Sequence, residues 1–145
     1  MKLNPDCIRD VLLFLEDNLL MGEYYCIKSI SISSIISGVS EDFEYEMEDI
    51  AYSIVQLMDA KYISGYKNYN GSAKKLYGEI DDITWEGHNF LNTVRSNTIW
   101  ETTKGSAKKL GISSIRGLGS LASMILNAII SNPEYIKSII STIPK

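Results

Sequence analysis

Near the start of the chain, apolar residues recur at the three- and four-residue spacing of a helix. Asn4 is a good N-cap residue, Pro5 suits the first helical position, and Asp6 suits the positive end of a helix. The sequence therefore predicts a helix from Pro5 to about Met21-Gly22. Its buried face is predicted to carry Ile8, Val11, Leu12, Leu15 and Leu19.

The pattern then changes, because residues 25–37 alternate isoleucine with serine and carry a single charge, Lys28. This composition predicts a strand that ends at Gly38, in place of a short second helix. A further helix is predicted beyond it, capped by Ser40. Its apolar stripe holds Phe43, Met47, Ile50, Ala51, Ile54, Leu57 and Met58, and its opposite face holds Tyr45, Glu48, Asp49, Tyr52, Gln56 and Asp59.

A β-hairpin is predicted next, with strands over 62–69 and 76–83 and a turn at Asn70-Gly71. Thr84 can cap a helix over 85–96, and Gly87 in its first turn would let that helix approach the domain closely. Asn97 is a candidate cap for another helix.

The predicted order is helix, strand, helix, hairpin, helix, which is typical of a winged-helix domain with the hairpin as the wing. We therefore expect an α+β fold, with a winged-helix-like domain over residues 1–104 and an apolar helical extension over 105–145.

Within that extension, the sequence predicts an apolar helix over 118–130 and a last helix after Asn132-Pro133. Three roles stay open: packing on the chain's own domain, self-association or binding to a partner, and membrane-surface association, which the few basic residues make the weakest. The residues predicted to form a contact surface are Leu121, Ile125, Ile129, Ile136 and Ile140.

The net charge of −4 is unevenly spread, because residues 1–60 carry −9 and residues 61–145 carry +5. Cys7 and Cys26 are far apart in the sequence, which favours free, buried thiols in a reducing compartment. The N-terminus lacks the apolar run of a signal peptide, and no segment is apolar for the length of a membrane span. We therefore expect a soluble, cytoplasmic protein in a bacterial host cell.

Little in the sequence points to catalysis. His88 is the only histidine, and neither cysteine lies near it in the sequence. The adjacent carboxylates are typical of a solvated surface, and no glycine-rich phosphate loop is present. We expect no catalytic residue, no cofactor and no metal site, and hence a protein that is not an enzyme.

Two binding surfaces are predicted instead. The wing lysines Lys67, Lys74 and Lys75 alternate with tyrosines and could contact a phosphate backbone. The helix in the recognition position, however, presents carboxylates, which repel phosphates. Its acidic, tyrosine-bearing face would suit a basic protein surface. That predicted protein-contact face comprises Tyr45, Glu48, Asp49, Tyr52 and Gln56.

Three blocks resemble an uncharacterised family of bacterial phage and prophage proteins. They are residues 2–13, residues 50–63, and the Thr84-Trp85-Glu86-Gly87-His88 block with its continuation to Trp100. The resemblance covers roughly residues 1–104 and implies a fold and a phage origin, but no activity. The chain departs from the family at Ser53, where histidine is more frequent, and at Lys61, where glycine is more frequent.

Together these observations predict a non-catalytic phage or prophage accessory protein that binds a protein partner or self-associates. The alternative is a winged-helix transcriptional regulator that binds DNA.

Overall fold

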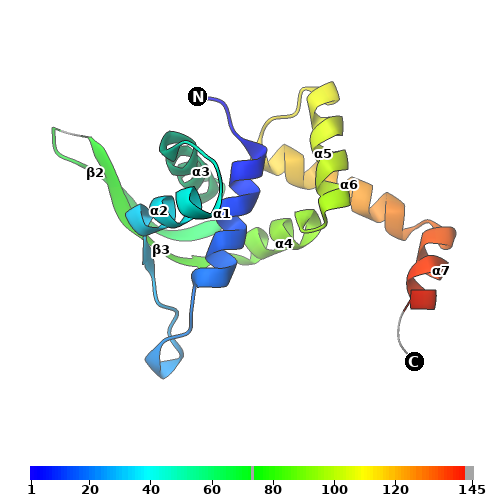
Figure 1. The fold of residues 1–145 in the computed structure, drawn as a ribbon, viewed down its shortest axis with the longest axis horizontal. Coiled ribbons are helices and arrows are strands. Elements are labelled where there is room, and N and C mark those ends of the chain that lie inside the picture. Colours follow the sequence, from blue (N-terminus) through cyan, green and yellow to red (C-terminus); the bar gives the residue numbers. More distant parts are fainter. Residues whose placement is uncertain (73, 143–145) are drawn as a thin grey trace. The chain divides into compact units, whose positions relative to one another are not determined.

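The computed structural model describes residues 1–72 and 74–142, which form helices and one small antiparallel sheet (Figure 1). The chain divides into two compact units, residues 1–92 and residues 93–145. The first unit holds the sheet, the helices before it in the sequence and most of the helix that follows it, and the second unit is helical.

Helix α1 (Pro5–Asn18) begins as predicted. The side chain of Asn4 accepts a hydrogen bond of 3.2 Å from the Cys7 backbone N–H. The helix ends three residues before the predicted Met21-Gly22, and Leu19, which forms its C-cap, is only half-buried. The rest of the predicted face is confirmed, because Ile8, Val11, Leu12 and Leu15 are buried.

The predicted strand over residues 25–37 is wrong for most of its length. A 3-10 turn, η1 (Glu23–Tyr25), precedes a two-residue strand, β1 (Ile30–Ser31), and residues 32–42 form helix α2 (Ile32–Asp42). The Ser31 side chain caps α2 by accepting a bond of 3.1 Å from the Ser34 N–H. Ile32, Ile35 and Val39 are buried at helical spacing, so tertiary packing outweighs the strand preference of the isoleucines.

Helix α3 (Met47–Asp59) therefore begins later than predicted. Ser40 lies inside α2 and is not the cap, while Phe43 is the C-cap of α2. Glu46 is the N-cap of α3 but makes no capping bond with its side chain. Met47 was predicted to be buried and is exposed, whereas Ile50, Ile54, Leu57 and Met58 are buried as expected.

The structure at the end of α3 explains why the resembled family more often has glycine where this chain has Lys61. Lys61 has a φ of 66°, in the left-handed region, and its N–H bonds to the Met58 carbonyl. The next N–H, from Tyr62, bonds to the Leu57 carbonyl at 2.9 Å. This is a Schellman motif, whose left-handed position favours glycine because a Cβ atom is strained there.

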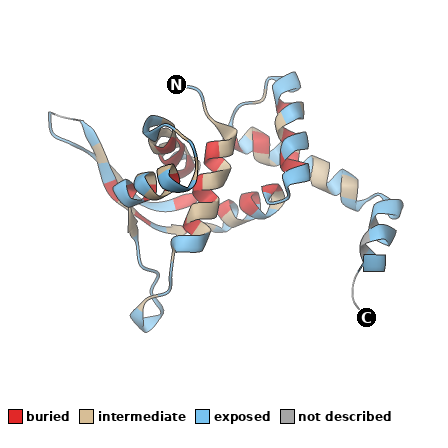
Figure 2. Cartoon of the chain, in the orientation of Figure 1, coloured by how far each residue is buried: buried red, intermediate tan, exposed pale blue. Residues whose placement is uncertain are grey.

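The predicted hairpin is confirmed to within one residue at each end. Strands β2 (Ile63–Asn70) and β3 (Lys75–Ile83) are antiparallel, and β1 pairs with the other edge of β3, which gives the order β1-β3-β2. Helices α1 and α2 pack against β3, and the three N-terminal helices pack against one another. The buried residues of this unit therefore gather between the helices and the base of the sheet (Figure 2).

Helix α4 (Trp85–Val94) starts as predicted and ends two residues earlier. The Thr84 hydroxyl accepts a bond of 3.1 Å from the Gly87 N–H and donates one of 2.7 Å to the Lys61 carbonyl. A Cβ atom on Gly87 would lie 2.0 Å from the Tyr62 carbonyl oxygen. Thr84 is thus the predicted cap, and Gly87 permits the predicted close approach of α4 to the backbone before β2.

The second unit contains α5 (Asn97–Leu110), α6 (Ile115–Ile130) and α7 (Pro133–Thr142). The N-cap of α5 is Ser96 and not Asn97, which is the first helical residue. Helix α6 begins three residues before the predicted Leu118. Residue 104, the predicted end of the first domain, lies within α5. In the described part of the chain, no single helix is both long and apolar enough to cross a bilayer. Helices α5 and α6 meet that criterion only as a pair, bent by 120° at their break.

Candidate functional site

The strand register sorts the hairpin side chains onto two faces. Tyr66, Asn68 and Asn70 alternate along β2, so they share one face, and their partners on β3 are Glu79, Tyr77 and Lys75. This set is called the aromatic face below. The opposite face carries Lys67, Tyr69 and Leu76.

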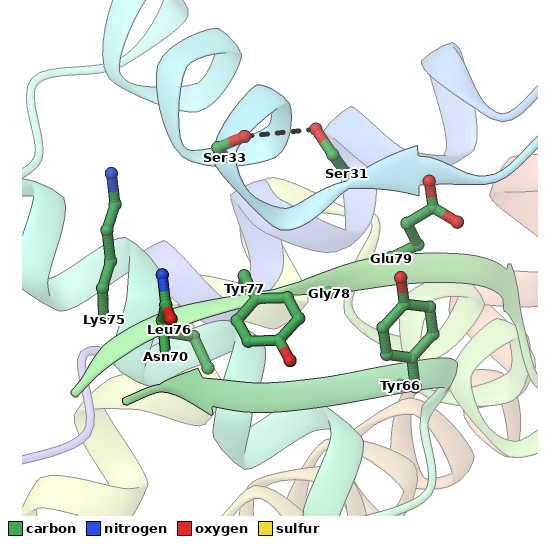
Figure 3. Close-up of a pocket in the computed structure, with 9 residues that line it drawn as sticks. All are labelled: Ser31, Ser33, Tyr66, Asn70, Lys75, Leu76, Tyr77, Gly78 and Glu79. Atoms are coloured by element: carbon green, nitrogen blue, oxygen red, sulfur yellow. Dashed lines mark hydrogen bonds between the residues drawn. The ribbon is translucent and has the colours of Figure 1, made fainter. Parts of the chain in front are cut away.

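A pocket of about 400 Å³ opens on the aromatic face, beneath the start of α2 (Figure 3). The rings of Tyr66 and Tyr77 lie beside it, and both side chains are about half exposed. The Lys75 ammonium and the Glu79 carboxylate stand at different ends of it (Figure 3). Its lining residues are Ser31, Ser33, Tyr66, Asn70, Lys75, Leu76, Tyr77, Gly78 and Glu79.

The three lysines predicted to contact DNA are not equivalent. Lys67 lies on the opposite face, where its ammonium forms an ion pair of 3.0 Å with Asp59 at the end of α3. Lys75 is exposed on the aromatic face, and Lys74 precedes it in the turn with a φ of 49°. Because Asp59 neutralises Lys67, the hairpin offers phosphates two lysines rather than three.

The predicted protein-contact face is only partly assembled. Glu48 is exposed on α3, whereas Asp49, Tyr52 and Gln56 are half-buried. Tyr45 does not belong to α3, because it lies in the loop before it and donates a hydrogen bond of 2.5 Å to Asp10 of α1. Burial, the bond to the Asp10 carboxylate and the nearby negative charges raise the pKa of the Tyr45 hydroxyl. We therefore infer that Tyr45 stabilises the first unit and does not form part of a contact face.

We expect Tyr45→Phe to lower the free energy of unfolding by about 2 kcal/mol at neutral pH, because it removes a hydrogen bond to a charged group. Since folding raises this pKa, the wild type loses the contribution as the pH rises above the unfolded tyrosine value of about 10. The difference between wild type and variant should therefore shrink in alkaline urea titrations. Tyr69→Phe, on the exposed hairpin, is the control and should show no such difference. A gap that is constant with pH would contradict the assignment.

The predicted contact surface in the C-terminal extension lies on α6 and α7. Leu121, Ile125 and Ile129 are half-buried on α6, and Ile140 of α7 is exposed. The side chain of Ile136 lies outside the described residues. Sequence reasoning missed three further apolar positions on these helices, Met124, Ile130 and Tyr135, which are also exposed.

The two cysteines have different environments. Cys7 is buried in the first unit, and desolvation raises the pKa of its thiol. Cys26 is exposed, so the prediction that both thiols are buried is wrong for this residue. The misassigned strand is the reason, because a strand there would have been covered. The loop between α1 and β1 also exposes Leu20, Met21, Tyr24, Tyr25 and Ile27, which no sequence pattern had indicated.

Residues 1–92 thus form a small α+β domain whose three-stranded antiparallel sheet carries a projecting hairpin, and a helical unit follows. The chain belongs to a family of uncharacterised function described as hypothetical protein (DUF2513), which matches residues 2–113. Neither the curated proteins nor the solved structures include a match to this chain.

Proposed function

We propose that this chain is a non-catalytic binding protein, in which a winged-helix-like module carries a helical extension that contacts a protein partner or a second copy. The order α1, β1, α2, α3, β2, β3 and the sheet order β1-β3-β2 support the winged-helix assignment. The single histidine and the two separated cysteines support a non-catalytic role. The resemblance to phage and prophage proteins supports a phage origin.

The proposal of a protein-contact surface rests on the second half of α6. Between residues 121 and 130, the polar side chains are Ser123 and Asn127, which lie four apart on one face. The rest of the helix surface is apolar, yet Ala122 is the only residue of this stretch that is buried. Helices that are apolar on nearly every side are normally covered. A protein surface that covers Met124 and Ile130 would remove this apolar area from water.

DNA binding by a winged-helix regulator is the second candidate, and the exposed Lys74 and Lys75 support it. The ion pair between Lys67 and Asp59 and the exposed Glu48 weigh against insertion of α3 into a duplex groove. We therefore rank contact through α6 first.

Sedimentation equilibrium over a concentration series tests self-association. We expect the wild type to exceed the monomer mass, and Met124→Asp with Ile130→Asp to restore the monomer, because a buried charge opposes association. Both side chains are exposed, Met124 by 68 %, so the fold should tolerate the change. Ser123→Asp with Asn127→Asp, on the polar stripe of the same helix, is the matched control and should leave the mass unchanged.

If the wild type is a monomer at every concentration, self-association is rejected and the partner form is tested directly. A photo-crosslinking residue at position 124 should then capture a protein in the native cell, and the same residue at position 127 should not. Equal crosslinking at both positions, or none at either, would contradict the proposed role of α6.

A further inference from the structure

The aromatic face of the β2–β3 hairpin is built from two tyrosines, two amides, a lysine and a carboxylate. We propose that the pocket on this face binds a segment of single-stranded nucleic acid. Single strands are held where unstacked bases meet aromatic rings and the backbone meets positive charge. Tyr66 and Tyr77 supply the rings, and Lys74 and Lys75 supply the charge.

The side chains along the pocket change from a positive charge to aromatic rings and then to a carboxylate. This order matches the phosphate, the base face and the base amino group of a nucleotide. Lys75 pairs with Asn70 next to the turn, so its ammonium group marks one end of the pocket, and the exposed Lys74 precedes it in the sequence. The rings of Tyr66 and Tyr77 follow towards the base of the hairpin (Figure 3). At the far end, the Glu79 carboxylate accepts a hydrogen bond of 3.2 Å from Ser29. Phosphates would lie near the lysines, bases on the rings, and base amino groups would donate to Glu79.

The same observations favour a single strand over a duplex. Bases in a duplex are stacked on one another, so their faces cannot reach Tyr66 or Tyr77. A duplex bound along α3 would also meet the exposed carboxylate of Glu48. The pocket of about 400 Å³ is at the lower end of the range for small-ligand sites, which suits one or two nucleotides of a longer strand.

Charge limits the strength of this binding. Residues 1–92 carry sixteen acidic and seven basic side chains, so the unit as a whole repels a nucleic acid. At about 0.15 M salt this repulsion is screened beyond about 8 Å, whereas contacts within the pocket persist. With two phosphate contacts, log Kd should rise with log salt concentration with a slope of about 1.4, and stacking should supply most of the affinity.

Fluorescence anisotropy with a labelled single-stranded oligonucleotide of about 12 nucleotides, as DNA and as RNA, tests the proposal with the full chain. We expect Tyr66→Ala and Tyr77→Ala each to weaken binding about tenfold. Lys75→Ala should lower the salt slope to about 0.7. The other hairpin face supplies the controls, because Tyr69 is as exposed as Tyr66, and Lys67 is paired with Asp59. Tyr69→Ala and Lys67→Ala should therefore leave binding unchanged.

Three results would overturn the proposal: no binding of either oligonucleotide, equal or tighter binding of the corresponding duplex, and equal competition by a mononucleotide. Loss of binding in the Tyr69 and Lys67 variants to the same extent as in the others would also place the site elsewhere. The α6 variants Met124→Asp and Ile130→Asp should not alter strand binding, so this proposal and the role of α6 can fail independently.

Discussion

Gly87→Ala is expected to lower the free energy of unfolding of the first unit by about 3 kcal/mol, with a fall in Tm of about 15 °C. The added Cβ atom would lie 2.0 Å from the Tyr62 carbonyl oxygen and 2.8 Å from Cγ2 of Ile83. The oxygen belongs to the backbone and accepts a 3.0 Å hydrogen bond from the Thr84 N–H, so it cannot move away without breaking that bond. Helix α4 would have to shift and would strain its capping bond at Thr84.

Gly105→Ala is the matched control for this prediction. Gly105 also lies inside a helix, α5, but a Cβ atom added there would meet nothing within 4 Å. Alanine should therefore stabilise the chain by about 0.5 to 1 kcal/mol, because glycine loses more conformational freedom when a helix forms. Thermal unfolding followed by circular dichroism compares the two variants. If Gly87→Ala is also neutral or stabilising, α4 does not pack against the Tyr62 backbone as described.

Trp100→Ala is expected to destabilise the second unit by about 4 kcal/mol, the usual cost of deleting a large buried ring. Trp100 lies on α5, it is 1 % exposed, and among the residues that the structure describes it is the largest that is fully buried. The Lys104 ammonium, one turn later on the same helix, lies 5.8 Å from the centroid of its ring. Hydrogen exchange should show lost protection in α5 and α6, since these two helices pack against each other.

The second tryptophan supplies the control. Trp85 is 80 % exposed at the start of α4, so Trp85→Ala should change the stability by no more than about 0.5 kcal/mol. Urea titration of both variants measures the difference. A loss below about 1 kcal/mol for Trp100→Ala would falsify the burial of this ring.

Both proposed binding surfaces consist of residues that do not belong to the buried core. Met124 and Ile130 on α6, and Tyr66 and Tyr77 on the hairpin, can be changed at little cost to folding because their side chains are exposed. Substitution of Gly87 or Trp100, in contrast, should lower the stability of the fold. It should weaken binding only because the fold is destabilised. Comparing the two groups of variants therefore separates a loss of binding from a loss of structure.

The sequence by itself determined those elements whose local signals agree with their tertiary environment. Asn4 caps α1 and Thr84 caps α4, and in both cases the side-chain oxygen accepts a backbone N–H three residues later. The hairpin strands alternate around Asn70-Gly71, and Gly87 stands where a side chain cannot fit. Capping, turn formation and close approach depend on one or a few neighbouring residues, so they can be predicted from a short stretch of sequence.

Only the tertiary structure decided the rest. The isoleucines of α2 prefer strands locally, and burial of Ile32, Ile35 and Val39 against the other helices overrides that preference. Likewise, the ion pair of Lys67 with Asp59 and the bond of Tyr45 to Asp10 join residues that are distant or on different elements. The aromatic face also required the strand register, because a shift of one residue would have exchanged Tyr66 with Lys67. Which residues contact each other across the fold depends on the packing of the whole unit. A local sequence pattern does not contain that information.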